Sequence, residues 1–178
     1  REDYQPPAWL VPQTRLKFTL GLEQTRVEAR LDVTRNPAAG PDEPLRLNGD
    51  GLTPVNLWVD GVAVTDWRME GPDLVIPLSG AAHAIGIETE INPAANTQLM
   101  GLYASNGMLC TQCEAEGFRR ITFFPDRPDV LSVYTVHMTG PKALFPVLLS
   151  NGNCTASGES ADGTHWAEWH DPFPKPSY

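Results

Sequence analysis

Hydrophobic and polar positions alternate along much of the chain, which predicts β-strands rather than helices. The alternation over residues 16–20, and again over residues 27–33, gives each segment one apolar and one polar face. These two runs predict a pair of antiparallel strands joined by a turn near Gly21 to Gln24. Further strand candidates are residues 74–76, 84–90, 133–137, 143–149 and 165–169.

Glycine, proline and asparagine separate these runs. Asp60-Gly61 lies between the apolar residues 57–59 and 62–64 and predicts a hairpin, because both turn positions tolerate positive φ. Asn151-Gly152 predicts a third hairpin in the same way. With 17 prolines and 15 glycines, the composition favours a turn-rich all-β fold. We expect an antiparallel sheet or sandwich-like domain with at most a turn or two of helix.

The best short helix candidate runs from Glu114 to Arg120, although Gly117 interrupts it. A glycine in a helix interior costs about 1 kcal/mol relative to alanine. The length of 178 residues and a hydrophobic fraction of 41% predict one globular domain over residues 1–178. Its loosest stretches are expected at residues 36–44 and 172–176.

The charge of the chain disfavours two classes of partner. Thirteen basic against 22 acidic residues give a formal net charge of −9, which opposes binding to nucleic acid or to an anionic membrane. No run of about 18 apolar residues is present to span a bilayer. Residues 1–7 lack the apolar stretch of a secretory signal, so a cytoplasmic location is the default expectation. A signal already removed by cleavage stays an open alternative.

The three cysteines cannot form a fully paired set within one chain. Cys110 and Cys113 are therefore expected to be reduced thiols, and Cys154 stands apart. The Cys110-x-x-Cys113 spacing is compatible with a redox motif or with half of a zinc ribbon. Neither is favoured, because no second cysteine pair follows and the four histidines show no ligand-like pairing with it.

His165 and His170 flank two tryptophans in a predicted strand. Residues five apart in a strand face opposite sides, so the two histidines do not chelate a metal together easily, and a structural role is favoured. Trp166 and Trp169 likewise face opposite sides, which makes one of them a core residue. A stand-alone β-sandwich module that binds protein or carbohydrate is the alternative function, but the five tryptophans are too dispersed to identify a binding platform.

Residues 101–134 form a polar, loop-like run in an otherwise strand-patterned chain. Within it, residues 111–120 (TQCEAEGFRR) and 126–130 (DRPDV) resemble the segment of zinc aminopeptidases of the aminopeptidase N type, in their bacterial form, that meets the substrate's free amino terminus. The resemblance to that family's amino-terminal domain extends over nearly the whole chain, through residues 45–49, 91–97, 148–153 and 169–176.

The resemblance implies a saddle-shaped antiparallel β domain that precedes a thermolysin-like catalytic domain holding zinc. The chain contains neither the His-Glu-x-x-His helix nor the Gly-x-Met-Glu-Asn segment of such enzymes. It is therefore interpreted as the amino-terminal domain only, without catalytic residues or metal ligands. The complete protein would be a zinc-dependent hydrolase acting on peptides with free amino termini, with its downstream catalytic domain as partner. We expect the isolated fragment to self-associate, because the missing domain leaves a surface uncovered.

The resemblance assigns Glu114 as the anchor of the substrate's α-ammonium group and Gln112 as its partner. A carboxylate is the natural receptor for an ammonium group, because charge-assisted hydrogen bonds are the strong ones. Residues two apart in an extended segment can point the same way, so both acceptors would meet one cation while Cys113 faces the protein. The family completes this site with a glutamate of the catalytic domain. From residue type alone, Glu114 and Glu116 would be interpreted as solvated loop acids. The resemblance over the extended motif favours the substrate-binding interpretation of Glu114 instead.

Two arginines follow this motif and predict a supporting role. Arg119 and Arg120 are expected to form ion pairs with Asp126 or Asp129, which would fix the loop that presents Glu114. The Asp126-Arg127-Pro128-Asp129 segment also predicts a rigid turn, because proline fixes its own φ and restricts the residue before it.

Overall fold

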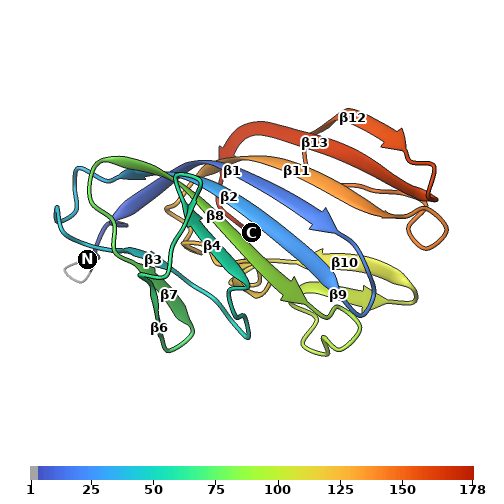
Figure 1. Cartoon of the computed structure of the whole chain (residues 1–178), viewed down its shortest axis with the longest axis horizontal. Coiled ribbons are helices and arrows are strands. Elements are labelled where there is room, and N and C mark those ends of the chain that lie inside the picture. Colours follow the sequence, from blue (N-terminus) through green and yellow to red (C-terminus); the bar gives the residue numbers. More distant parts are fainter. Residues whose placement is uncertain (1–3) are drawn as a thin grey trace.

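The computed structural model describes residues 4–178, so the first three residues of the polar amino-terminal stretch lie outside it. The predicted all-β class is confirmed (Figure 1). The strands are β1 (Trp9–Thr19), β2 (Thr25–Arg35), β3 (Leu45–Leu47), β4 (Asn56–Val59), β5 (Val62–Ala63), β6 (Arg68–Glu70), β7 (Asp73–Ile76), β8 (Ala82–Ile91), β9 (Gly101–Ser105), β10 (Met108–Gln112), β11 (Ser132–Pro141), β12 (Asn153–Glu159) and β13 (Thr164–Lys175).

Helical structure is limited to one short turn in the described part of the chain. This 3-10 turn, η1 (Phe118–Arg120), lies at the end of the segment for which a turn or two was expected. No helix within residues 4–178 has the length and apolar character needed to cross a membrane.

One eight-stranded sheet organises the molecule, in the order β12-β13-β11-β1-β2-β8-β4-β5. A three-stranded sheet, β3-β7-β6, and the β9-β10 hairpin lie beside it (Figure 1). The expected antiparallel pairing holds with one exception, since β1 runs parallel to β11 with Gln13 opposite Val133 and Thr19 opposite Thr139. This pairing joins β1 to a strand more than a hundred residues later and places β11 in the interior of the sheet, between β13 and β1.

Two of the three predicted hairpins are confirmed. β1 and β2 pair antiparallel on either side of residues 20–24. β4 and β5 are joined by Asp60 at φ 53° and Gly61 at φ 81°, the left-handed conformations that the Asp-Gly pair tolerates. The alternation of the flanking runs was sufficient to place the first connection, and the Asp-Gly turn chemistry was sufficient to place the second.

The third hairpin was predicted at the wrong place. Asn151-Gly152 leads from a loop into β12, and β12 pairs with β13 through the turn at residues 160–163, where the Gly163 amide donates to the Ser160 carbonyl. Residues 143–149 are a loop rather than a strand. Within that loop Phe145 and Leu148 are buried against β13 while their neighbours are exposed, so the apolar run fills a local gap without forming a strand. Most of residues 172–176, expected to be loose, belongs to β13.

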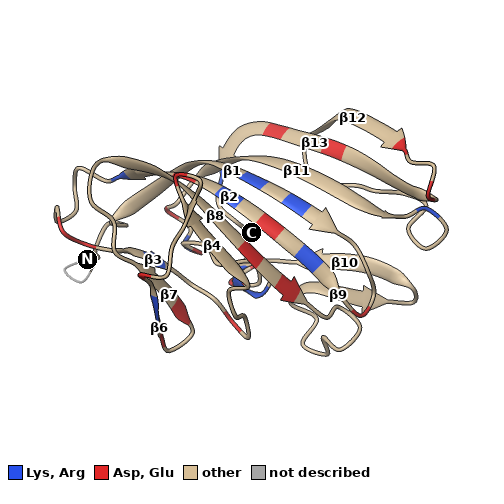
Figure 2. Ribbon diagram, in the orientation of Figure 1, with Lys and Arg blue, Asp and Glu red and all other residues tan. Residues whose placement is uncertain are grey.

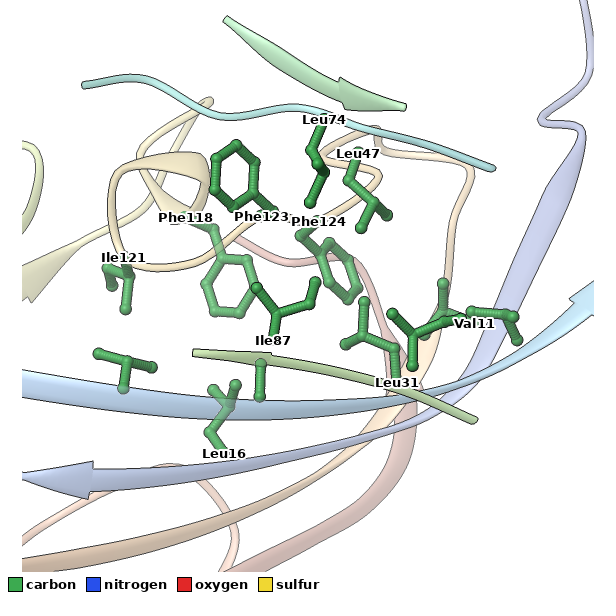
Figure 3. Close-up of a cluster of buried hydrophobic side chains, with 14 of the residues drawn as sticks. Val11, Leu16, Leu31, Leu47, Leu74, Ile87, Phe118, Ile121, Phe123 and Phe124 are labelled. Carbon is green, nitrogen blue, oxygen red and sulfur yellow. The ribbon is translucent and has the colours of Figure 1, made fainter. Parts of the chain in front are cut away.

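The core lies between the inner face of the large sheet and the segments that cross it. Leu31 of β2 and Ile87 of β8 face the aromatic residues of η1 and of the segment after it, while Leu47 and Leu74 close the cluster from the small sheet (Figure 3). Phe118 packs against Phe124 with ring centroids 5.0 Å apart and nearly perpendicular planes, a favourable aromatic geometry.

The outer face of the large sheet is polar and carries opposite charges in rows across β1, β2 and β8 (Figure 2). Lys17 lies opposite Glu28 with 3.2 Å between Nζ and Oε1, and Arg15 contacts Asp32 at the same distance. Exposed pairs of this kind contribute under about 1 kcal/mol each. They define which side of the sheet faces solvent and leave the inner face to build the core and the groove described below.

Candidate functional site

A largely apolar groove of about 740 Å³ opens on the inner side of the large sheet. Its lining combines inward-facing side chains of β1 and β11 with several other segments. These segments are β10 with the turn that follows it, the loop at residues 144–151, and the end of β13 with residues 175–178; Leu102, Phe118 and Ile121 complete the lining. We call this space the groove; the predicted residues Gln112 and Glu114 both line it.

The turn after β10 presents these two residues. The Gly117 amide donates to the Cys113 carbonyl at 3.0 Å and closes the turn. The Gln112 side-chain amide nitrogen donates to the Glu114 backbone carbonyl at 2.8 Å, so the amide oxygen of Gln112 stays available as an acceptor. Cys113 packs against the core, as predicted, while Gln112 and Glu114 are exposed. Gln112 and Glu114 therefore face solvent while Cys113, between them, faces the core, which is the alternation expected from the sequence.

Position 117 requires glycine because a Cβ atom would not fit there, and not because of its backbone angles. Its φ of −85° is open to any residue, but a Cβ at this position would lie 2.2 Å from the Gln112 carbonyl oxygen and 2.8 Å from the Cys113 Cα. Both contacts are with backbone, which cannot give way cheaply. The glycine that seemed to interrupt a helix in fact allows the turn to fold back on the end of β10.

Glu114 differs electrostatically from the rest of the groove. The charged side chains in the lining are Glu114, Asp171 and Lys175. Lys175 pairs with Asp171, and this contact lowers the pKa of the Asp171 carboxyl. Within residues 4–178, no ion pair is formed by Glu114. An exposed carboxylate beside an acceptor amide, in otherwise neutral surroundings, is suited to bind a small cation that donates several hydrogen bonds.

The Cys110-x-x-Cys113 spacing does not form a redox pair of the activated kind. Burial, with the nearby Asp126 charge as a smaller cause, raises the pKa of the Cys113 thiol to about 11. A reactive thiol of such motifs requires the opposite shift. All three cysteines, which lie in the described part of the chain, are unpaired.

The predicted supporting ion pairs are confirmed in part. Arg119 binds Asp126, with 2.9 Å between Nε and Oδ2. Arg120 instead pairs with Asp50, which no local pattern indicated. Asp129 pairs with its near neighbour Arg127. Asp129 also accepts from the Tyr4 hydroxyl and Arg127 donates to the Gln5 carbonyl, each at 2.8 Å, so this part of the DRPD segment is bound to the start of the described chain.

The histidines and tryptophans of β13 have structural partners. His165 contacts the Phe145 carbonyl oxygen at 2.6 Å, and the Trp169 indole donates to the Leu148 carbonyl. Trp166 stacks on His137 on the opposite face of the sheet, so the two tryptophans do point opposite ways. Among residues 4–178, no group of three or more histidine, cysteine or acidic side chains is placed to hold a metal ion.

Sequence reasoning did not find two parts of the groove. Ser177 donates a hydrogen bond to Asp126 from 51 residues away, and the Tyr134 hydroxyl lies buried at the base of the groove, where burial raises the pKa of the phenol. Neither residue follows a local motif. Only the long-range pairing of β11 with β13 brings these segments together, and a single sequence gives no signal of that pairing.

The sequence matches the family model described as the peptidase M1 N-terminal domain over residues 63–178. The chain belongs to this family. Aminopeptidase N of Caulobacter vibrioides is 50% identical over 178 residues, which cover 99% of this chain and 20% of that protein. Aminopeptidase N of Escherichia coli is 46% identical, with 100% of this chain and 20% of that protein covered. The M1 N-terminal domain thus spans 20% of the length of these curated relatives.

Solved structures agree on the fold. The crystal structure of Legionella pneumophila aminopeptidase A in complex with aspartic acid matches with a TM-score of 0.92 at 30% identity, over 99% of this chain and 21% of that one. The M1 zinc metallopeptidase of Deinococcus radiodurans matches with a TM-score of 0.79 at 19% identity, over 97% of this chain and 41% of that one, and shows the fold alone. The resemblance drawn from the sequence is confirmed at the level of the family.

Replacing Gly117 with alanine is expected to destabilise the M1 N-terminal domain. The added carbon forces the turn away from β10, and such overpacking costs about 1–3 kcal/mol. For a chain of this size, each kcal/mol lowers Tm by about 2–4 °C. Thermal unfolding followed by circular dichroism measures the change. Gly40→Ala is the matched control, because its Cβ would approach only the flexible end of Glu43, at 3.3 Å. An unchanged Tm for Gly117→Ala would contradict the packing argument.

Cys113 is expected to react slowly with thiol reagents at neutral pH. With a pKa of about 11, its thiolate fraction increases about tenfold per pH unit between pH 7 and 9, and its labelling rate should increase in step. The measurement uses a Cys110→Ser/Cys154→Ser variant and a chromogenic disulfide, with Cys113→Ser added as the blank. A rate that reaches a plateau near pH 7 would show an activated thiol and restore the redox interpretation.

Proposed function

We propose that this chain is the amino-terminal domain of a zinc-dependent aminopeptidase, a hydrolase that removes amino-terminal residues from peptides. Family membership and relatives named aminopeptidase N, five times longer than this chain, support the proposal. One hydrophobic cluster includes side chains of the large sheet, the small sheet and η1, which supports treating residues 1–178 as one domain. The catalytic domain would be a separate part of the complete protein.

In this proposal the domain contributes Gln112 and Glu114 to anchoring the substrate's free α-ammonium group. The observation that supports the assignment best is that Glu114 is the charged side chain of the groove without an ion-pair partner among the described residues. The Gln112 amide oxygen adds a second acceptor, since its nitrogen is already used on the Glu114 carbonyl. An α-ammonium group has three N–H donors and a positive charge, which matches two oxygen acceptors of which one is charged.

Among residues 4–178, no cluster of ligating side chains is placed to hold zinc. In this proposal the chemistry at the scissile bond is assigned to the catalytic domain of the complete protein. The amino-terminal domain would bind and orient the substrate, which raises the effective concentration of the peptide bond at the catalytic centre. Alone it holds half of an amine site. One carboxylate attracts a cation in water by only about 1 kcal/mol at 4 Å, so we expect no activity and little peptide affinity from the isolated chain.

Replacing Glu114 with alanine in the complete enzyme is expected to reduce kcat/KM for an unblocked chromogenic amino-acid amide by about a hundredfold. A lost charge-assisted hydrogen bond and a misplaced substrate each account for effects of that size. Glu23→Ala is the control, because Glu23 is exposed in the turn between β1 and β2 and does not line the groove. Near-normal kcat/KM for Glu114→Ala, or an equal loss for Glu23→Ala, would refute the assignment.

We also propose a cytoplasmic location, which the three unpaired thiols support because disulfides are rare in reducing compartments. Cell fractionation of the complete protein would decide this point.

The surface around the groove supports two partners. Met108, Leu144, Val147 and Leu149 are each more than half exposed there. We propose that the catalytic domain of the same protein covers these side chains, and that a second copy takes its place when the domain is alone. Clustered exposed apolar side chains of this kind mark interaction surfaces.

The isolated domain is therefore expected to self-associate as its concentration is raised. Sedimentation velocity over a hundredfold range of concentration measures it, and Val147→Lys/Leu149→Lys should return the protein to a monomer because the lysines would have to be desolvated. Val62→Lys, at an equally exposed apolar position on β5, is the control. A strictly monomeric profile at millimolar concentration would rule out self-association through this surface.

A further inference from the structure

We propose that Asp126 is a positioning residue that holds two parts of the groove at a fixed separation, through Arg119 on one side and Ser177 on the other. The proposal rests on the proposed function, because it concerns how the amine site is presented. Both residues bound to Asp126 belong to segments adjoining or lining the groove, whereas Asp126 itself does not line it.

Asp126 is a buried carboxylate whose two oxygens are both bound. Its side chain is 1% exposed. Oδ2 accepts from the backbone N–H of Arg119 at 3.2 Å and from its Nε at 2.9 Å, while Oδ1 accepts a hydrogen bond from the Ser177 hydroxyl. Arg119 also donates from its terminal nitrogen to the Asp126 backbone carbonyl at 2.9 Å. Such a fully satisfied buried charge resists displacement, because moving any donor leaves the charge uncompensated.

Arg119 connects this carboxylate to the turn that presents Glu114. It lies two residues after Gly117, whose amide closes the turn on Cys113. Its guanidinium is 3.6 Å from the Glu116 carboxylate, and its backbone carbonyl accepts from the Asp50 amide at 2.9 Å. The end of the turn at Arg119 is therefore held by contacts of the Arg119 side chain and by a hydrogen bond to its backbone carbonyl. The near end is held by β10, so Glu114 sits on a short segment fixed at both ends.

Ser177 connects the same carboxylate to the carboxyl-terminal part of the groove lining. Residues 175–178 line the groove together with Gln112 and Glu114. Lys175 pairs with Ser132 of β11 in the sheet, but Ser177 is beyond the last strand and outside the sheet register. Its hydrogen bond to Asp126 ties this segment to the residues that follow η1. The hydrogen bond joins residues 51 positions apart in the sequence and sets the distance between two segments that line the groove.

The alternative is that these contacts only stabilise the fold. The two possibilities differ in what happens once Glu114 is gone. A residue that acts by placing Glu114 has no further effect on turnover in a Glu114→Ala background, whereas a general stabiliser affects both backgrounds equally.

The test uses the complete enzyme and an unblocked amino-acid amide. Ser177→Ala and Asp126→Asn are made alone and with Glu114→Ala, and Ser177→Thr keeps the hydroxyl. Ser157→Ala, on the exposed part of β12, is the control. We expect Ser177→Ala to lower kcat/KM about tenfold, mainly through KM, since a small misplacement of a binding group has effects of this order. Ser177→Thr should retain most of the activity that Ser177→Ala loses. Neither Ser177→Ala nor Asp126→Asn should change turnover in the Glu114→Ala background.

Full activity of both Ser177→Ala and Asp126→Asn would overturn the inference, and so would an equal loss in the two backgrounds. If Asp126→Asn does not fold, the Ser177 series decides alone, with Tm recorded for each variant. Failure of the proposed function is visible separately. It would appear as normal turnover by the single Glu114→Ala variant, whatever the Ser177 variants do.

Discussion

Burial of the aromatic segment from Phe118 to Phe124 against the inner face of the large sheet is the packing on which the site depends. Phe123 and Phe124 are fully buried, and Phe118 meets Phe124 and Tyr134 edge to face. Apolar burial of this kind stabilises by about 1.5–3 kcal/mol per side chain, far more than any surface contact nearby. The turn that carries Glu114 comes directly before this segment, so the packing of the core determines where the turn lies.

Two carboxylates near the groove illustrate opposite uses of the same group. Asp126 is buried and has every oxygen bound, so its charge organises the protein around it. Glu114 is exposed and forms no ion pair among the described residues, so its charge remains free to meet a ligand. The formal net charge of −9 counts both carboxylates alike and does not indicate which of them is available to a ligand. Asp171 and Lys175 pair and neutralise each other, so Glu114 carries the net charge of the groove lining.

The parts of the fold that sequence could predict are those fixed by local physics. The Asp60-Gly61 hairpin follows from two positive φ values, and the inward position of Cys113 follows from alternation. The Asn151-Gly152 prediction failed because turn chemistry shows where a chain bends and not which strand it will pair with. The parallel pairing of β1 with β11 is non-local, and so is the Ser177 contact, which depends on the pairing of β11 with β13. The candidate residues were therefore found, while the contacts that position them were not.

The apolar lining and the lone acid belong together for an electrostatic reason. Between charges 4 Å apart, the attraction is about 1 kcal/mol in water and about 4 kcal/mol at an effective dielectric constant near 20. An open groove leaves Glu114 close to the first value, because solvent reaches it. A partner that buries Met108, Val147 and Leu149 also excludes water from Glu114 and moves the interaction toward the second value. The surface that would hold another domain is thus the same surface that would make a single carboxylate strong enough to select an ammonium group.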